Sequence, residues 1–286
     1  MFPTIGHLFS YLTGVSLHLP VATFGFFMVL SFAGAWWSFR SEYKRKEAEG
    51  LIGEAGGIVH PYQLMDRLLL ACGITGFAGA ILFSKLEGVY GLNYYGALIA
   101  GALTYLYINR KHGISLAIAA DIGSPGMMLA YGIGRIGCHL AGDGDWGIVN
   151  EAPKPAWLRW APEWVWGFRY PHNSIHQGMY IPGCPDNYCT VLPAPVYPTP
   201  FYEAVLCIIL FFVLWALRRK IKTAGVLFAV YALLNGAERF TIEFIRVNPR
   251  YSIGAWKLSQ AQWLALGWIA VGLIAMILAL RQPKSG

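Results

Sequence analysis

The sequence predicts an all-α integral membrane protein with about seven transmembrane helices. Three observations support this fold class. Hydrophobic residues make up 56% of the chain and charged residues 13%, and the mean hydropathy is +0.46, which is too apolar for an ordinary soluble domain. Several apolar runs approach the roughly 20 residues that a helix needs to cross a bilayer. Basic residues gather after alternate runs, as in cytoplasmic loops.

The predicted spans lie at about 20–37, 64–83, 92–108, 114–140, 200–217, 224–244 and 261–280. Before them, residues 1–19 carry apolar side chains suited to lie along the membrane surface. They lack the basic start of a signal peptide, so no cleavable one is expected. After the first span, RSEYKRKEAEG and IGEAGGIVHP predict a loop. Pro125 in the fourth span should kink or break that helix.

One long stretch, residues 141–199, does not have the composition of a span. It is rich in Trp, Pro, Gly and Tyr and has turn signals throughout, which predicts an external, lid-like loop at the membrane–water interface. Cys184 and Cys189 lie within it, and a disulfide could join them if the loop faces an oxidising compartment. The whole chain, residues 1–286, is predicted to be one membrane-embedded domain.

The basic residues predict the orientation of the chain. One set of loops holds Arg40, Lys44, Arg45, Lys46, Arg110, Lys111, Arg218, Arg219, Lys220, Lys222, Arg281 and Lys284. The other set, in longer loops, holds Lys85, Lys154, Arg159, Arg169, Arg250 and Lys257. The positive-inside rule places the first set and the C-terminus in the cytoplasm, and the N-terminus and the large loop outside. Contact with anionic membrane lipids then explains the net charge of +7, and no nucleic-acid partner is expected.

Arginines inside apolar runs are the first candidate functional residues. Arg135 and Arg239 lie within predicted spans, and Arg246 lies at the outer edge of the sixth. A charge at bilayer depth costs about 2.5–3.5 kcal/mol, so each arginine needs a partner. The carboxylates Glu203, Glu238 and Glu243 lie near the same face and could form an ion-paired core that only fixes helix packing. Two intramembrane arginines favour an anion site instead, because guanidinium matches phosphate.

Around Arg135 the chain reads YGIGRIGCHLAGDGDWG. Gly134 and Gly137 would let a lipid headgroup approach closely, although helix packing explains them equally well. His139, Asp143 and Asp145 are candidates for a general base or for hydrogen-bond partners of a headgroup. The alternatives are an interfacial histidine and aspartates that form turns or caps.

Aromatic residues begin two of the spans on the same side. Tyr197 and Tyr202 lie within YPTPFYE, which opens the fifth span, and Tyr94 and Tyr95 start the third span. They either reach an outer cavity or belong to an interfacial aromatic belt.

Four stretches together resemble the prolipoprotein diacylglyceryl transferases. GRIGCHLAGDGDWG resembles their signature beginning G-R-x-G-N, and NYYGALIAG resembles H-G-G-L-I-G. YPTPFYE resembles H-P-[ST]-Q-x-Y-E, and AERFTIEFIR resembles x-x-R-x-x-x-E-x-x-R. The resemblance runs from about residue 24 to the C-terminus. It implies a multi-pass enzyme of the bacterial inner membrane that transfers the diacylglyceryl group of phosphatidylglycerol to the lipobox cysteine of prolipoprotein signal peptides. It implies no metal or organic cofactor.

The resemblance also implies roles for residues at matching positions. Arg135 would bind the phosphatidylglycerol headgroup, and Arg239 would hold the phosphate and stabilise the leaving group. The same site would be lined by Tyr202, Glu203, Glu243 and Arg246.

The chain departs from the family pattern at several positions. Tyr95 and Tyr197 replace histidines, Cys138 replaces an asparagine, Pro200 a glutamine and Phe24 a tyrosine. Tyr95 would then donate a hydrogen bond, with His139 or Asp145 taking the thiol proton. These departures also leave room for a non-catalytic phospholipid-binding paralogue. A small-solute transporter is the weakest alternative, because paired interrupted helices are missing.

Overall fold

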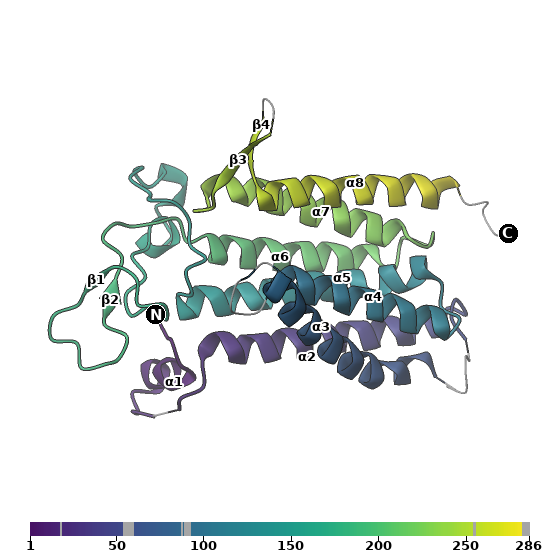
Figure 1. Cartoon of the computed structure of the whole chain (residues 1–286), viewed down its shortest axis with the longest axis horizontal. Helices are drawn as coiled ribbons and strands as arrows, with labels where there is room; N and C mark the ends of the chain where they lie inside the picture. The colour runs from purple at the N-terminus through teal and green to yellow at the C-terminus, as the bar shows by residue number, and fades with distance from the viewer. Residues whose placement is uncertain (18, 54–59, 87, 89–92, 254–255, 282–286) are drawn as a thin grey trace.

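The computed structural model describes residues 1–17, 19–53, 60–86, 88, 93–253 and 256–281. Within them the protein is mostly helical, and its long helices run side by side in one bundle (Figure 1). The long helices are α2 (Thr23–Ala48), α3 (Leu64–Leu86), α4 (Tyr94–Lys111), α5 (Leu116–Ala141), α6 (Thr199–Leu217), α7 (Val226–Ile242) and α8 (Gln260–Arg281). Each predicted span coincides with one of them.

Four helical segments are long and apolar enough to cross a membrane: Pro61–Leu86, α5, α6 and α8. The second half of α2 is charged, and α7 has 17 residues. The structure therefore supports a helical protein with four candidate membrane-spanning helices, while the total of seven spans stays a prediction.

The predicted loop after the first span is wrong in its first part. Helix α2 continues through RSEYKRKEA to Ala48, because opposite charges on this stretch pair along the helix. Arg45 contacts Glu42 at 2.6 Å and Glu49 at 2.8 Å. The glycine-rich part at 54–59, the turn at 87 and 89–92, and the tail at 282–286 lie outside the described residues.

A break at Pro125 is also wrong, because α5 is continuous through it. Ser124, Pro125 and Gly126 are all buried, and a Cβ on Gly126 would overlap the Phe39 ring of α2. The hydroxyl of Ser124 donates to the carbonyl of Ala120 at 2.7 Å. Tight packing and such side-chain hydrogen bonds compensate for a proline inside a buried helix.

Helix α5 is the central element and packs against α2, α6 and α7, while α3 pairs with α4 and α7 with α8. At the end of the bundle near Arg218, the buried carboxylate of Glu42 accepts from Arg218 Nε at 2.7 Å. Asp121 of α5 accepts the backbone N–H groups of Gly225 and Phe228, both at 2.8 Å. These contacts join the helices at this end.

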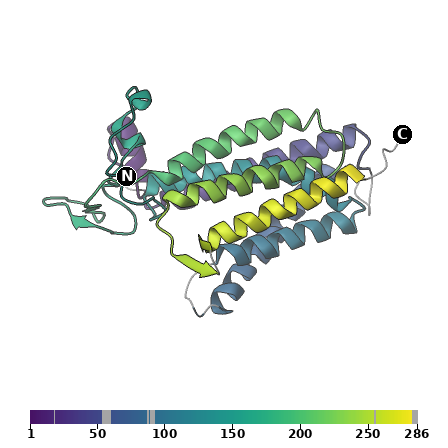
Figure 2. The same cartoon turned by 90° about the horizontal axis from the view of Figure 1, so that it is seen from above.

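An irregular segment between α5 and α6, residues 142–198, lies at the other end of the bundle, together with the N-terminus (Figures 1 and 2). It contains short 3-10 helices, η2 (Ala156–Leu158) and η3 (Glu163–Val165), and the antiparallel strands β1 (Met179–Tyr180) and β2 (Thr190–Val191). The remaining short elements are α1 (Ile5–Thr13), η1 (Pro61–Gln63), η4 (Glu243–Ile245), β3 (Arg250–Ile253) and β4 (Trp256–Ser259). The C-terminal end of α8 lies opposite (Figure 1).

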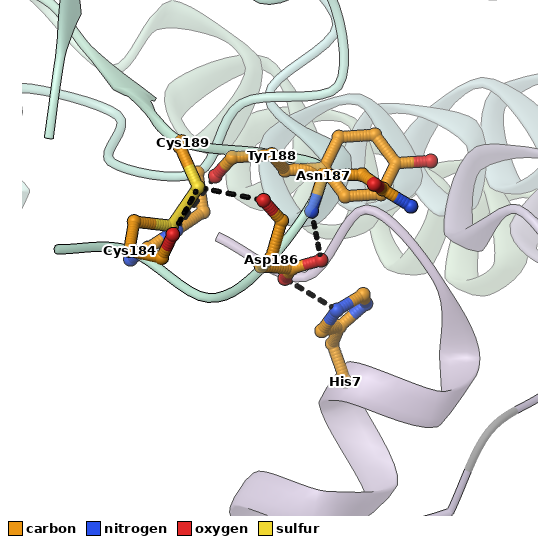
Figure 3. Close-up of a disulfide and its surroundings, with 7 residues drawn as sticks. His7, Cys184, Asp186, Asn187, Tyr188 and Cys189 are labelled. Carbon is orange, nitrogen blue, oxygen red and sulfur yellow. Dashed lines mark hydrogen bonds and ion pairs between the residues drawn. A yellow bond between two sulfur atoms is a disulfide. The ribbon is translucent and has the colours of Figure 1, made fainter.

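The sequence left open whether Cys184 and Cys189 are bonded, and the structure joins them in a disulfide. The loop that it closes presents Asp186 to α1, where the Asp186 carboxylate lies 2.7 Å from His7 Nε2 (Figure 3). The ring of Tyr188 meets the ring of His7 edge-on. This loop therefore holds α1 against the outer segment.

Candidate active site

Six charged side chains gather where the outer segment meets the bundle. Arg135 comes from α5, Glu203 from the start of α6 and Arg239 from α7. Glu243 begins η4, Arg246 directly follows it, and Asp145 lies in the loop after α5. We call these six residues the arginine cluster.

Glu203 lies at the centre of the cluster and is fully buried. Its carboxylate lies 2.8 Å from Arg135 Nε, and it accepts from Arg239 at 3.0 Å and Arg246 at 3.2 Å. The hydroxyl of Tyr131 also donates to it, at 3.3 Å. One carboxylate thus holds together three guanidinium groups that would otherwise repel each other.

Asp145 and Glu243 complete the charge balance. Asp145 pairs with Arg135 through one oxygen and accepts from Arg246 through the other, at 2.6 Å. Burial alone would raise the pKa of Asp145, but Arg135 and Arg246 together lower it below its ordinary value. Glu243 lies 3.1 Å from Arg239 NH2. Three arginines therefore face three carboxylates, and the cluster has no net formal charge.

The three arginine side chains differ in their solvent exposure. The side chain of Arg246 is 7% exposed, that of Arg135 13% and that of Arg239 23%, whereas Asp145 is 37% exposed. Of the three guanidinium groups, those of Arg135 and Arg239 are therefore more accessible than that of Arg246.

The backbone around Gly147 explains why Asp145 and Arg246 meet. The Gly147 N–H donates to the Tyr197 carbonyl at 2.8 Å, and the Ile148 N–H donates to the Ile245 carbonyl at 2.8 Å. A Cβ on Gly147 would overlap the Ile245 carbonyl and lie 2.8 Å from Tyr197 Cβ. Only glycine allows this close crossing.

Sequence reasoning missed Gly147 and Thr199. The Thr199 hydroxyl donates to the Asp145 carbonyl at 2.8 Å, which ties the loop to the start of α6. The Trp-Gly pair that closes the Arg135 motif was the available signal for Gly147, and the [ST] position of the H-P-[ST]-Q-x-Y-E pattern was the available signal for Thr199.

The two glycines beside Arg135 have different surroundings. A Cβ on Gly137 would lie 2.6 Å from Phe27 Cβ of α2, so Gly137 allows close helix packing. A Cβ on Gly134 would meet no atom within 4 Å. Packing therefore accounts for Gly137, and Gly134 borders open space.

Other predicted residues make their contacts elsewhere. His139 Nδ1 lies 3.1 Å from the Tyr170 hydroxyl, and its ring is surrounded by the aromatic rings of Trp164, Phe168 and Phe201. The Tyr202 hydroxyl donates to the Val165 carbonyl at 2.6 Å, which ties α6 to the outer segment. Tyr95 lies in the first turn of α4, and its role stays a prediction.

Two further carboxylates, those of Glu238 and Asp143, lie near the cluster. Glu238 is buried, and its oxygens have no hydrogen-bond partner among the described residues. Ligand atoms of Cys138, Asp143 and Asp145 lie within 4.8 Å of one another, close enough to share a metal ion. However, Asp145 is already paired with Arg135 and Arg246, and these two guanidinium groups would repel a cation bound there.

Comparison with known proteins identifies relatives of the chain. A family model described as prolipoprotein diacylglyceryl transferase matches residues 12–278, which include the whole arginine cluster. A phosphatidylglycerol–prolipoprotein diacylglyceryl transferase of Stenotrophomonas maltophilia is 26% identical, with 93% of this chain and 90% of the relative aligned. The enzyme of the same name from Xylella fastidiosa is 29% identical over 71% of this chain and 67% of the relative. That of Leptospira interrogans is 26% identical over 86% and 77%.

Proposed function

Because the chain belongs to the prolipoprotein diacylglyceryl transferase family, we propose that its arginine cluster binds the phosphate of phosphatidylglycerol. The protein is a membrane transferase of lipoprotein biosynthesis that moves the diacylglyceryl group from phosphatidylglycerol to prolipoproteins. The observation that supports this site is the convergence of Arg135, Arg239 and Arg246 on the buried carboxylate of Glu203.

The cluster suits a phosphodiester because its guanidinium groups are already held in place. Glu203 and Glu243 fix the arginines, so little reorganisation is needed when an anion binds. The partly exposed Arg135 and Arg239 then contact the phosphate with paired N–H groups. Open space beside Gly134 leaves room for the headgroup next to Arg135.

The same contacts assist bond cleavage. The thiol sulfur attacks the glyceryl carbon that carries the phosphate ester, a carbon–sulfur bond forms, and the carbon–oxygen bond breaks. Glycerol phosphate leaves with the electron pair, and its phosphate gains one negative charge. Preorganised guanidinium groups stabilise such developing charge most strongly in a site shielded from water. In this reaction Arg135, Arg239 and Arg246 contact the phosphate, and Glu203 and Glu243 position them.

We also propose a setting for the reaction. Seven helices cross the bacterial inner membrane as a single domain, with the segment after α5 outside and the C-terminus in the cytoplasm. The basic loops support this orientation, as does the position of the N-terminus beside the outer segment, opposite the end of α8 (Figures 1 and 2). The lipobox cysteine of a prolipoprotein signal peptide then reaches the cluster from the external face. The mechanism needs no cofactor.

Replacing Arg135 by alanine tests the site. We expect Arg135→Ala to lower transfer to a lipoprotein substrate by at least about 10²-fold, the typical loss when one charge-stabilising donor is removed. Arg159→Ala removes an exposed arginine of the outer segment and serves as the matched control. Both variants and the wild type are compared in a strain depleted of the native enzyme and with purified protein.

Two outcomes would contradict these proposals. Equal transfer by the Arg135 and Arg159 variants would remove Arg135 from the site. A well-expressed wild-type protein that cannot lipidate the substrate would contradict transfer itself and favour a phospholipid-binding paralogue.

A further inference from the structure

The transfer reaction needs a group that takes the proton of the incoming thiol, since the thiolate is the nucleophile. The carboxylates of the arginine cluster are poorly suited to this task. Asp145, Glu203 and Glu243 each pair with two or three guanidinium groups, so their oxygens are already occupied. The paired arginines also lower the pKa of Asp145. His139 faces Tyr170 within an aromatic shell. The proton acceptor must therefore lie beside the cluster, outside its ion pairs.

Glu238 also lacks an ion pair among the described residues, but it is buried within α7. Asp143 lies beside the cluster on the outer segment. It lies in the loop after α5, is partly buried, and accepts the Asp145 backbone N–H at 3.3 Å. It forms no ion pair with an arginine in the part of the chain that the structure describes. It is nevertheless close to the cluster, because its carboxylate and that of Asp145 lie within 4.8 Å of each other.

The surroundings of Asp143 favour proton uptake. Burial raises the pKa of Asp143, and the negative charge of Asp145 raises it further. Hydrogen bonds from Cys138 and from the Asp145 N–H, and the charge of Arg135, oppose this rise with smaller effects. The groups that face it are Arg135 and Cys138 from α5, Asp145 from the same loop and Tyr170 from the outer segment. Asp143 and Asp145, two residues apart, therefore have pKa values shifted in opposite directions, as in sites that separate a base from a charge stabiliser.

The chain's own Cys138 shows that a thiol fits between these groups. Its sulfur lies within 4.8 Å of the carboxylate oxygens of Asp143 and Asp145, and 3.9 Å from Arg135 NH1. A thiol in this place has a carboxylate on one side to take its proton. On the other side lies the guanidinium of Arg135, which is itself paired with Asp145 and Glu203.

We propose that Asp143 is the general base that accepts the proton of the prolipoprotein cysteine, an inference that rests on the proposed function. The S–H proton moves to the Asp143 carboxylate, and the sulfur keeps the electron pair and attacks the glyceryl carbon. The carbon–oxygen bond to phosphate breaks, and glycerol phosphate leaves with that electron pair. Asp143 then returns its proton to the phosphate or to water, which completes the cycle without an oxidant or a metal.

The pH dependence of an Asp143→Asn variant tests this role. Asparagine keeps the size and the acceptor for the Asp145 N–H but cannot take a proton. Near pH 6.5 we expect transfer to fall by about 10²–10⁴-fold, the usual contribution of a general base. The deficit should shrink about tenfold per pH unit up to the thiol pKa of about 8.5, as solvent supplies the thiolate. The wild-type rate should instead rise only until Asp143 is ionised and then stay level.

Controls separate this role from a structural one. Glu151→Gln removes an exposed carboxylate of the same segment and should match the wild type at every pH, and Asp143→Glu should recover part of the rate. Phosphatidylglycerol should still raise the melting temperature of Asp143→Asn as it does for the wild type.

Three results would overturn the proposal. They are a wild-type rate and pH profile for Asp143→Asn, a loss that is the same at every pH, or a loss that accompanies failed phosphatidylglycerol binding. A wild-type protein that binds phosphatidylglycerol yet forms no product would overturn the proposed function, and this inference with it.

Discussion

Replacing Glu203 by glutamine tests whether one buried charge holds the arginine cluster together. The carboxylate lies 2.8 Å from Arg135 Nε, 3.0 Å from Arg239 NH1 and 3.2 Å from Arg246 NH1. Glutamine has nearly the same shape and keeps one acceptor oxygen. It removes the negative charge, however, and turns an NH₂ donor toward groups that are themselves donors.

The expected effect follows from the charge balance. Without Glu203 the three arginines face only Asp145 and Glu243, so one positive charge is left uncompensated in a buried place. Removing one partner of a buried pair costs about 3–5 kcal/mol. We expect the lower end, about 3 kcal/mol less free energy of unfolding, because the remaining carboxylates still contact all three arginines. A bound phosphodiester would restore the balance, so phosphatidylglycerol should stabilise this variant more than the wild type.

Thermal denaturation in phosphatidylcholine nanodiscs, with and without phosphatidylglycerol, measures both effects. Glu163→Gln is the control, because Glu163 is 86% exposed and pairs with Lys154 at 3.2 Å, and such surface pairs contribute about 0–1 kcal/mol. If Glu203→Gln melts at the same temperature as the control, Glu203 is not the main counter-ion of the arginines. If phosphatidylglycerol stabilises the wild type and the Glu203 variant equally, the anion does not enter the cluster.

Two further predictions concern the backbone crossing at Gly147 and the orientation of the chain in the membrane. Gly147→Ala should lower the free energy of unfolding by about 1–3 kcal/mol and reduce transfer, because the added Cβ would overlap the Ile245 carbonyl. Gly134→Ala is the control, and it should leave stability unchanged in the same melting assay because no atom lies within 4 Å of its Cβ. Equal stability of both variants would contradict the argument. In intact cells, a membrane-impermeant thiol reagent should label Arg159→Cys directly and Lys222→Cys only after permeabilisation, because both positions are exposed. The reverse pattern would contradict the proposed orientation.

The sequence predicted the long helices well because each membrane span needs a continuous apolar run. Reliance on apolar runs also explains why the sequence predicted the end of α2 poorly. Apolar composition ends where the apolar environment ends, whereas the helix continues as long as pairs such as Arg45–Glu49 support it. The break predicted at Pro125 failed because local backbone preference says nothing about the packing of Gly126 against Phe39.

The members of the arginine cluster could be predicted as residue types, since an arginine in an apolar run demands an anionic partner. Their pairing could not. Asp145 meets Arg246 only because the chain crosses tightly at Gly147, a contact between segments about a hundred residues apart. Spacing was also misleading for His139, which lies one helical turn after Arg135 but points toward Tyr170.

The departures from the family pattern affect one half of the chemistry more than the other. Phosphate binding depends on Arg135, Arg239 and Arg246, and all three are present and held in place by buried carboxylates. Proton removal depends on a single group with an available lone pair, and the histidine of the family pattern is a tyrosine at position 95. A carboxylate next to the cluster but outside its ion pairs meets this need without disturbing the arginines. Asp143 occupies such a position, beside Asp145 and the thiol of Cys138. The two functions can therefore diverge separately, because charge stabilisation and proton transfer rest on different residues of one site.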